Sequence, residues 1–229
     1  MTTTSTARVT APEPIIAHAP AASGCGEACG IAPIGDEWCS EGVELLDAHQ
    51  RAMAQFDHAV HQVRDDQWDR PTPCTEWPVR VLVNHLVCEQ LWVPHLIRGE
   101  TIADVGNRYE GDVLGADPVK AWERAAADSR DALTAPGALT RSVHLSYGDD
   151  SAVSYAWQLT CDLAVHGWDL ATAIGTDPAI DDELATTVYT WVEPLVDQWR
   201  DFGIFAPPVP VPHGAGPTDR LVALLGRRP

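Results

Sequence analysis

Basic side chains are scarce in this chain. Its 229 residues include 15 lysines and arginines against 33 aspartates and glutamates, which gives a formal net charge of −18. Binding to nucleic acid requires a basic surface that neutralises phosphates, and binding to an anionic membrane surface requires the same. The deficit argues against both kinds of partner.

Long apolar runs are missing as well. No stretch approaches the roughly 20 apolar residues that a membrane-spanning helix needs, and residues 1–23 show no basic segment leading into an apolar one, as a secretory signal would. The chain has neither a phosphate-binding glycine-rich loop nor a Gly-x-Ser-x-Gly nucleophile motif. The six cysteines then favour a reducing compartment, and we expect a cytoplasmic protein.

The apolar residues that are present recur with a helical period. They make up 45% of the chain, which is enough for a core. Their three- and four-residue steps predict a short last helix at 219–225 and longer ones over 37–64, 76–98, 118–134, 151–174 and 181–201. Thr75 is the expected cap of the second helix, and Pro194 the expected bend of the fifth. Residues 141–150 either pair briefly as strands or stay extended. The pattern predicts an all-α fold, a bundle of about four principal helices.

The first 36 residues differ in composition from the rest. They are rich in threonine, alanine and proline, and residues 23–30 are rich in glycine, which disfavours a stable helix. We therefore expect an irregular or flexible arm over 1–36 and a single helical domain over 37–229. Three alternatives are open for Cys25, Cys29 and Cys39: they form a disulfide, they bind a second metal, or they have no special role. Their spacing matches no standard zinc motif.

Asp162 and His166 give the strongest functional signal. Their spacing of four residues is about one helical turn, so both side chains leave the same helix face about 6 Å apart. That face also carries Tyr155, Leu159 and Leu163, and we expect it to enter the core. A carboxylate and an imidazole are costly to bury together unless a charged group binds them. A divalent metal is the simplest such group.

His85 extends this set from another helix. It lies on an apolar stripe between Leu82 and Leu86, and alone it would fit a core histidine equally well. With Asp162 and His166 it makes two imidazoles and one carboxylate, which leaves a coordination position open, as in catalytic metal sites. Helical bundles assemble metal sites in this way, so we predict that these three residues bind a metal.

Other polar residues near the predicted site have two readings each. Asp169 either accepts a hydrogen bond from a ligating histidine or belongs to a surface pair at the helix end. Cys88 and Cys161 either join a mixed site or pack as small apolar residues, and Cys74 is expected to pack at the helix entry. The remaining histidines, His49 among them, are scattered. Of these, His58 and His61 share a helix face and either line the mouth of a pocket or are solvated.

Two segments resemble a known family. Residues 72–87 (TPCTEWPVRVLVNHLV) and 162–171 (DLAVHGWDLA) are similar to two signatures of the mycothiol-dependent maleylpyruvate isomerase-like, or DinB-like, metal-binding proteins of actinobacteria. The ending over 202–212 and 219–227 is similar too. The resemblance implies a DinB-like four-helix bundle that binds a divalent metal, commonly zinc, through His85, Asp162 and His166. In the isomerase the residue at the place of Asp162 is a glutamate, a longer ligand.

The resemblance also implies an activity. It points to a metal-dependent enzyme that uses a low-molecular-weight thiol, mycothiol, for thiol transfer or isomerisation of a small electrophilic substrate. A metal with an open position lowers the pKa of a bound thiol and so provides a thiolate. Bound water would instead make the protein a hydrolase of a thiol conjugate or amide, and a non-catalytic metal-binding module is the third reading. The sequence leaves the oligomeric state open.

Overall fold

The computed structural model of the protein describes residues 41–75, 77–201 and 203–229. The predicted arm over 1–36 lies outside these residues, and so do Cys25, Cys29 and Cys39. Across the described part of the chain, no helix is both long and apolar enough to cross a membrane.

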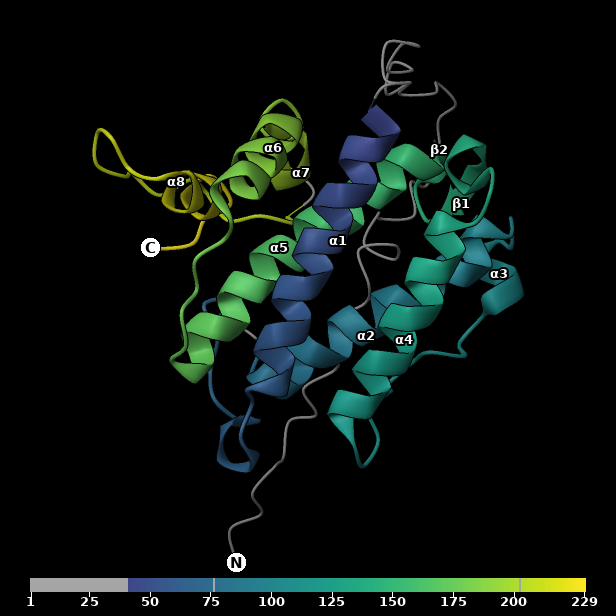
Figure 1. Ribbon diagram of the computed structural model, residues 1–229, viewed down its shortest axis with the longest axis horizontal. Coiled ribbons are helices and arrows are strands. Elements are labelled where there is room, and N and C mark those ends of the chain that lie inside the picture. The colour runs from purple at the N-terminus through teal and green to yellow at the C-terminus, as the bar shows by residue number, and fades with distance from the viewer. Residues whose placement is uncertain (1–40, 76, 202) are drawn as a thin grey trace, which may run out of the picture.

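Four long helices form the body of the protein (Figure 1). They are α1 (Glu41–His61), α2 (Val79–Ile97), α4 (Pro118–Thr134) and α5 (Ala152–Ile174). Helix α1 packs along α5 and α2 packs along α4, while further contacts join α2 to α5 and α1 to α4. These contacts close a four-helix bundle, so the all-α prediction is confirmed.

Helix α5 is the central element. The side chain of Ser151 caps its first turn by accepting a hydrogen bond from the backbone N–H of Ser154, and Gly175 ends it in the left-handed conformation (φ +77°). Almost every residue between these caps is buried. Such a helix presents two opposite faces to different neighbours, and polar residues on both faces need partners inside the bundle.

Helix α2 begins later than predicted. Its N-cap is Pro78, whose side chain makes no capping bond, so the expectation that Thr75 caps a helix from residue 76 is wrong. Pro71 and Pro78 form an isolated antiparallel bridge, and the N–H of Val79 donates to the carbonyl of Arg70 (2.9 Å). These bonds hold Arg70 and Pro71 against Pro78 and Val79, so the helix begins only at Val79.

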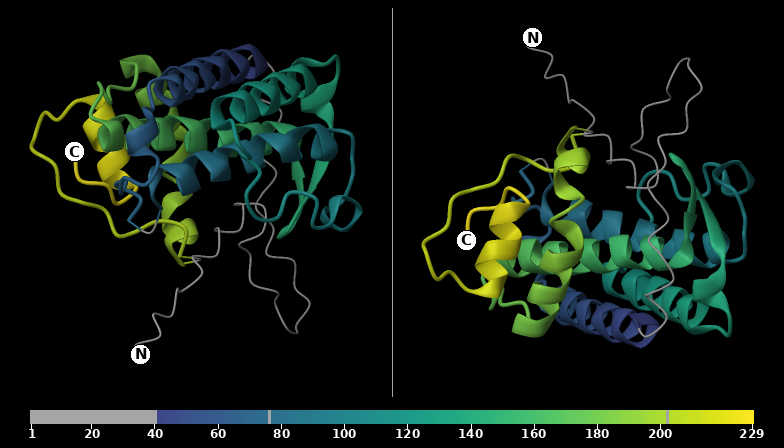
Figure 2. Two further views of the ribbon diagram at one scale, coloured as in Figure 1. Left: turned by 90° about the horizontal axis from the view of Figure 1, so that it is seen from below. Right: turned by 90° about the horizontal axis from the view of Figure 1, so that it is seen from above.

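Smaller elements cover the two ends of the bundle (Figure 2). One end carries the short helix α3 (Ile102–Val105) and a two-stranded hairpin. The hairpin strands β1 (Ser142–Leu145) and β2 (Gly148–Ser151) are antiparallel, with Ser142 opposite Ser151. The strand alternative for residues 141–150 is therefore confirmed.

The C-terminal helices lie at the other end (Figure 2). They are α6 (Asp182–Val192), α7 (Val196–Asp201) and α8 (Pro217–Leu224). The chain breaks between α6 and α7 at Pro194, as the sequence predicts, because proline has no N–H for a helical bond. Helix α8 packs on α6, which in turn contacts α5, and this arrangement brings the end of the chain back to the bundle.

Candidate metal centre

His85, Asp162 and His166 meet between α2 and α5. Nε2 of His85 lies 3.1 Å from Oδ2 of Asp162, and Nε2 of His166 lies 3.3 Å from Oδ1 of the same carboxylate. The exposed fractions of the three side chains are 1%, 5% and 8%. The structure thus brings together all three predicted ligands, away from bulk water.

The spacing of the donor atoms can be compared with that around a bound ion. Each of the three residues offers one ligand atom, and these atoms all lie within 4.8 Å of one another. Two ligands of a tetrahedral zinc ion, each about 2.0–2.1 Å from the metal, are about 3.4 Å apart. The two measured separations are close to that value, so the donor set fits a divalent ion with a coordination position to spare.

Asp169 orients one of the imidazoles. Its Oδ2 lies 2.9 Å from Nδ1 of His166, and its side chain is fully buried. With Nδ1–H donating to Asp169, Nε2 of His166 faces Asp162 and is the nitrogen left to bind a metal, which is the arrangement that carboxylates give to metal-binding histidines. The predicted hydrogen bond is therefore present, and the surface-pair alternative is wrong because residue 169 faces the core.

Arg227 balances the charge of Asp169. Its Nη2 lies 2.9 Å and its Nε 3.4 Å from the carboxylate oxygens, and the pair is buried. The turn that delivers Arg227 depends on Gly226, which has φ +85° and lies against Ala206 so closely that a Cβ there would come within 2.6 Å of the alanine's own. Sequence reasoning missed Arg227, although the family-like ending at 219–227 contained it.

The surrounding charges set the pKa values of the site. Burial by itself lowers the pKa of His166, but the carboxylates of Asp162 and Asp169 outweigh burial and raise it to about 9. Burial likewise favours the neutral form of Asp162, yet His85 and His166 hold the pKa of this carboxyl far below its usual range. Without a metal, His166 therefore carries a proton at neutral pH.

Trp77 forms a wall of the site. Its ring centroid lies 4.7 Å from that of His85 and 5.4 Å from that of His166, and it stacks on the latter with an interplanar angle of 28°. Within the described residues, Nδ1 of His85 is buried without a hydrogen-bond partner, so His85 is held by ring packing against Trp77, whereas His166 is held by a hydrogen bond to Asp169. The sequence indicates that Trp77 belongs to the family-like 72–87 segment but gives no sign that its ring lies against the two histidines.

Three cysteines lie near these residues. Cys74 forms a second group with His166 and Asp169, whose ligand atoms also lie within 4.8 Å of one another; its closeness to the site was not predicted. The first group is the better candidate because Arg227 already neutralises Asp169. Cys88 and Cys161 belong to neither group, and burial raises the pKa of each thiol to about 12. They pack as small apolar residues.

Comparisons with known proteins agree with this fold. Residues 49–171 match the family model described as the mycothiol maleylpyruvate isomerase N-terminal domain. Two uncharacterized proteins of Mycobacterium tuberculosis, from strains CDC 1551 / Oshkosh and H37Rv, are 34% identical to this chain over 191 residues, which cover 81% of this chain and 98% of each relative.

A solved structure extends the comparison. The crystal structure of a histidine-to-alanine mutant of the mycothiol-dependent maleylpyruvate isomerase is similar with a TM-score of 0.53, over 64% of this chain and 67% of that chain, at 14% sequence identity. At this identity the likeness shows the fold alone, and it confirms the predicted DinB-like bundle. With more than half of its residues matched by the family model, the chain belongs to the mycothiol maleylpyruvate isomerase N-terminal domain family.

Proposed function

We propose that this protein is a metal-dependent enzyme that uses mycothiol to isomerise a small electrophilic substrate or to transfer the thiol to it. His85, Asp162 and His166 are the proposed ligands of the divalent metal, most simply zinc. The observation that carries the proposal is the convergence of these three buried donors at the spacing of metal ligands, in a chain whose family description names mycothiol and maleylpyruvate isomerase.

The charge of the site supports an anionic ligand such as a thiolate. With neutral imidazoles, the carboxylates of Asp162 and Asp169 and the guanidinium of Arg227 leave one net negative charge. With a divalent ion held by His85, Asp162 and His166, these groups would carry one net positive charge in a site almost closed to water, and a single thiolate would neutralise it. Hydroxide would do so too, so the reaction without thiol is a necessary part of the test.

The chain's own residues have separate roles in this proposal. When bound, the metal acts as a Lewis acid that lowers the pKa of the thiol. Asp169 holds His166 in the tautomer that offers Nε2, and Arg227 keeps Asp169 ionised. The half-buried ring of Trp77 covers both imidazoles, where it offers an apolar surface to the substrate and limits the access of water.

The test combines metal analysis with an assay. The gently purified protein is analysed for metal, and turnover of maleylpyruvate is measured with and without mycothiol. We expect bound zinc and a mycothiol-dependent reaction that falls at least about 100-fold in His166→Ala, which removes a ligand. The matched control is His144→Ala, which removes an exposed histidine paired with Asp149 and should leave the rate unchanged.

Three results would contradict the proposal. An unchanged rate in His166→Ala would show that the cluster is not the reaction site. Turnover that is equally fast without mycothiol, with water added to the product, would identify a hydrolase. A protein that purifies without metal, is stably folded and takes up no zinc would be the non-catalytic bundle.

A further inference from the structure

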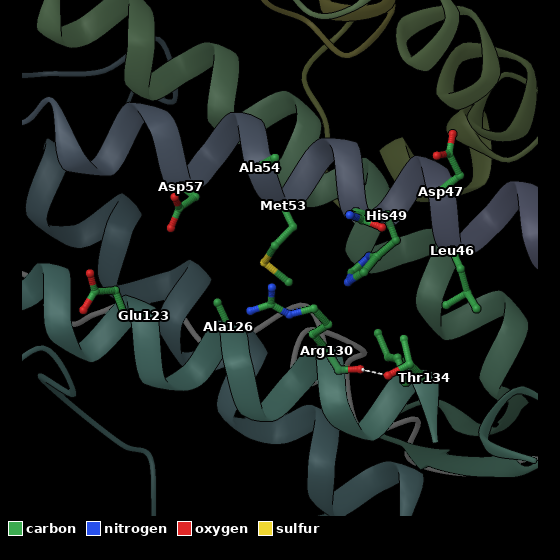
Figure 3. Close-up of a pocket in the computed structure, with 12 residues that line it drawn as sticks. Leu46, Asp47, His49, Met53, Ala54, Asp57, Glu123, Ala126, Arg130 and Thr134 are labelled. Atoms are coloured by element: carbon green, nitrogen blue, oxygen red, sulfur yellow. Dashed lines mark hydrogen bonds between the residues drawn. The ribbon is translucent and has the colours of Figure 1, made fainter. Parts of the chain in front are cut away.

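A second polar site lies in a cavity of about 750 Å³ between α1 and α4 (Figure 3). None of the proposed metal ligands lines it. The two sites use opposite faces of α5, because Thr160 contacts the cavity residue His49 while Asp162, two positions further along, contacts His85. The cavity is therefore separate from the metal centre.

The acidic residues of the cavity already have partners. Three carboxylates line it, and each is within hydrogen-bonding distance of a neighbouring group: Asp47 with Arg51 (2.8 Å), Asp57 with the indole N–H of Trp122 (2.9 Å) and Glu123 with Nε2 of His61 (3.0 Å). The three carboxylates at the rim of the cavity therefore already have hydrogen-bonding partners in the protein.

Arg130 is the cationic residue of the lining, and its charge is unmatched. Its backbone carbonyl accepts a hydrogen bond from Oγ1 of Thr134 (2.8 Å; dashed in Figure 3). Its guanidinium makes no hydrogen bond or ion pair with any other described residue, and the side chain is exposed. In a chain with a net charge of −18, this unpaired arginine is available to form a charge-assisted hydrogen bond with an anionic group.

His49 supplies a second unmatched group, whose hydrogen-bonding role can be assigned. The hydroxyl of Thr160 donates to the carbonyl of Ala156 (2.7 Å), and since a hydroxyl has a single hydrogen, it can only accept from His49. Nδ1–H of His49 is therefore the donor in the 3.1 Å contact with Thr160. In the neutral ring Nε2 then carries no hydrogen and can only accept a hydrogen bond.

This acceptor has no partner. His49 is 4% exposed, and among the described residues Nε2 is buried without a hydrogen bond. Burial lowers the pKa of His49 to about 4, so the ring stays neutral at physiological pH. The ring extends from α1 into the space between the helices (Figure 3). A buried acceptor without a donor is costly, and a ligand O–H or N–H would relieve that cost.

We propose that the α1–α4 cavity binds a small hydroxylated carboxylic acid. Its carboxylate pairs with Arg130, its apolar body lies against Met53 and Leu133, and its hydroxyl donates to Nε2 of His49. The cavity volume is within the range of small-molecule sites, about 300–1,000 Å³, and the acidic rim disfavours a polyanion or an acidic peptide. Met53 and Arg130 also line the cavity and have long unbranched side chains, and the proposal requires their rotation to open Nε2 to the hydroxyl.

Calorimetric titration with three matched probes tests the proposal on the full chain. 4-Hydroxyphenylacetate has all the required groups, phenylacetate lacks the hydroxyl, and tyramine replaces the carboxylate by an amine. We expect 4-hydroxyphenylacetate to bind at least about tenfold more tightly than either of the others, since each lost contact is a hydrogen bond or a charge-assisted one. Binding should be the same with and without zinc.

Two variants and a spectroscopic signal locate the binding. Arg130→Gln should weaken binding at least about tenfold, whereas Arg124→Gln, an exposed arginine of α4 outside the cavity lining, should not. His49→Asn keeps an amide donor for Thr160 but removes Nε2, and it should lose the preference for the hydroxylated probe. In the wild-type protein, the ¹⁵N resonance of Nε2 should move as the hydroxyl binds, whether or not that variant folds.

The proposal is overturned if no probe binds, or if the two arginine variants weaken binding equally. It is also overturned if the Nε2 resonance stays in place at saturating 4-hydroxyphenylacetate. Either of the last two results would mean that the acid associates with the surface elsewhere.

Discussion

Two buried histidines on opposite sides of α5 have opposite protonation behaviour. His166 is next to the carboxylates of Asp162 and Asp169, which raise its pKa to about 9. His49 has a threonine hydroxyl as its partner, and burial lowers its pKa to about 4. Both rings are almost inaccessible to water, so burial cannot explain the difference.

The partners on α5 do explain it. The hydroxyl of Thr160 and the carboxylate of Asp162 are two positions apart and project from opposite faces of the helix. A hydroxyl fixes a tautomer without supplying charge, whereas a carboxylate stabilises the imidazolium. One helix thus places a carboxylate against a protonated imidazole on one face and a hydroxyl against a neutral imidazole on the other.

The substitution Asp162→Asn should have the largest effect, because it makes the metal side resemble the His49 side. It removes the only carboxylate among the proposed ligands, so zinc affinity should fall on the order of 10³-fold, about 4 kcal/mol, and the pKa of His166 should fall. Competition with a chelator and an NMR titration of the histidines measure the two quantities. Asp131→Asn, an exposed aspartate of α4, is the control; zinc affinity within tenfold of the wild type would remove Asp162 from the ligand set.

Arg227→Met should have the next largest effect. It leaves Asp169 as a buried carboxylate without its guanidinium, and removing one partner of a buried pair costs about 3 kcal/mol or more. Chemical denaturation of the metal-free protein measures the loss. Arg228→Met changes the neighbouring exposed arginine and should change the free energy of unfolding by less than about 0.5 kcal/mol. Equal effects of the two variants would mean that the buried pair does not stabilise the fold.

The stability of the metal-free protein should pass through a maximum near pH 6.5. The folded pKa of His49, about 4, is below the unfolded value, so its contribution grows as the pH rises from 4 to 6.5. The folded pKa of His166, about 9, is above the unfolded value, so its contribution is full below pH 6.5 and is lost as the pH rises to 9. Each change is on the order of 3 kcal/mol.

Urea denaturation at pH 5, 6.5 and 9 measures this dependence. In the zinc-loaded protein the decrease above pH 6.5 should disappear, since the ion replaces the proton of His166. A metal-free protein whose stability does not fall between pH 6.5 and 9 would contradict the assigned protonation of His166.

Thr160→Val should have the smallest effect and should act on one side of the helix only. It leaves Nδ1–H of His49 without an acceptor in the core, at a cost of about 1–2 kcal/mol, while zinc content stays the same. Thr190→Val is the matched control, because the Thr190 hydroxyl makes a similar bond to a backbone carbonyl but is exposed. Loss of zinc in Thr160→Val would mean that the two faces of α5 are coupled.

The features of the site that were predictable from the sequence follow from relations within one helix. The step of four residues puts Asp162 and His166 on one face, and a further step of three brings in Asp169. The apolar stripe around His85 indicated that this residue is buried. That α2 faces α5 did not follow from the stripe; it followed from the hypothesis of a helical bundle. The main helices were predictable for the same reason, since their apolar period is long and regular.

Contacts made by residues outside the regular helices were not predictable, because no apolar period shows which way these segments run. Arg227 and Trp77 come from irregular stretches whose path depends on the finished fold, and the start of α2 depends on the bridge between Pro71 and Pro78. The burial of His49 is another feature that was not predictable, because the sequence shows this residue only as one of several scattered histidines. His49 lies on the face of α1 that packs against α5, and its partner Thr160 becomes apparent only when the two helices are together.

The pairing of Asp169 with Arg227 affects the timing of assembly during translation. The two residues are 58 positions apart, and chains are made from the N-terminus at about 5–20 residues per second. A nascent chain therefore contains every proposed metal ligand several seconds before it contains the guanidinium that balances Asp169. Throughout that interval the growing polypeptide lacks the partner of Asp169, and a zinc ion bound by the proposed ligands would offset that carboxylate if the bundle has already formed.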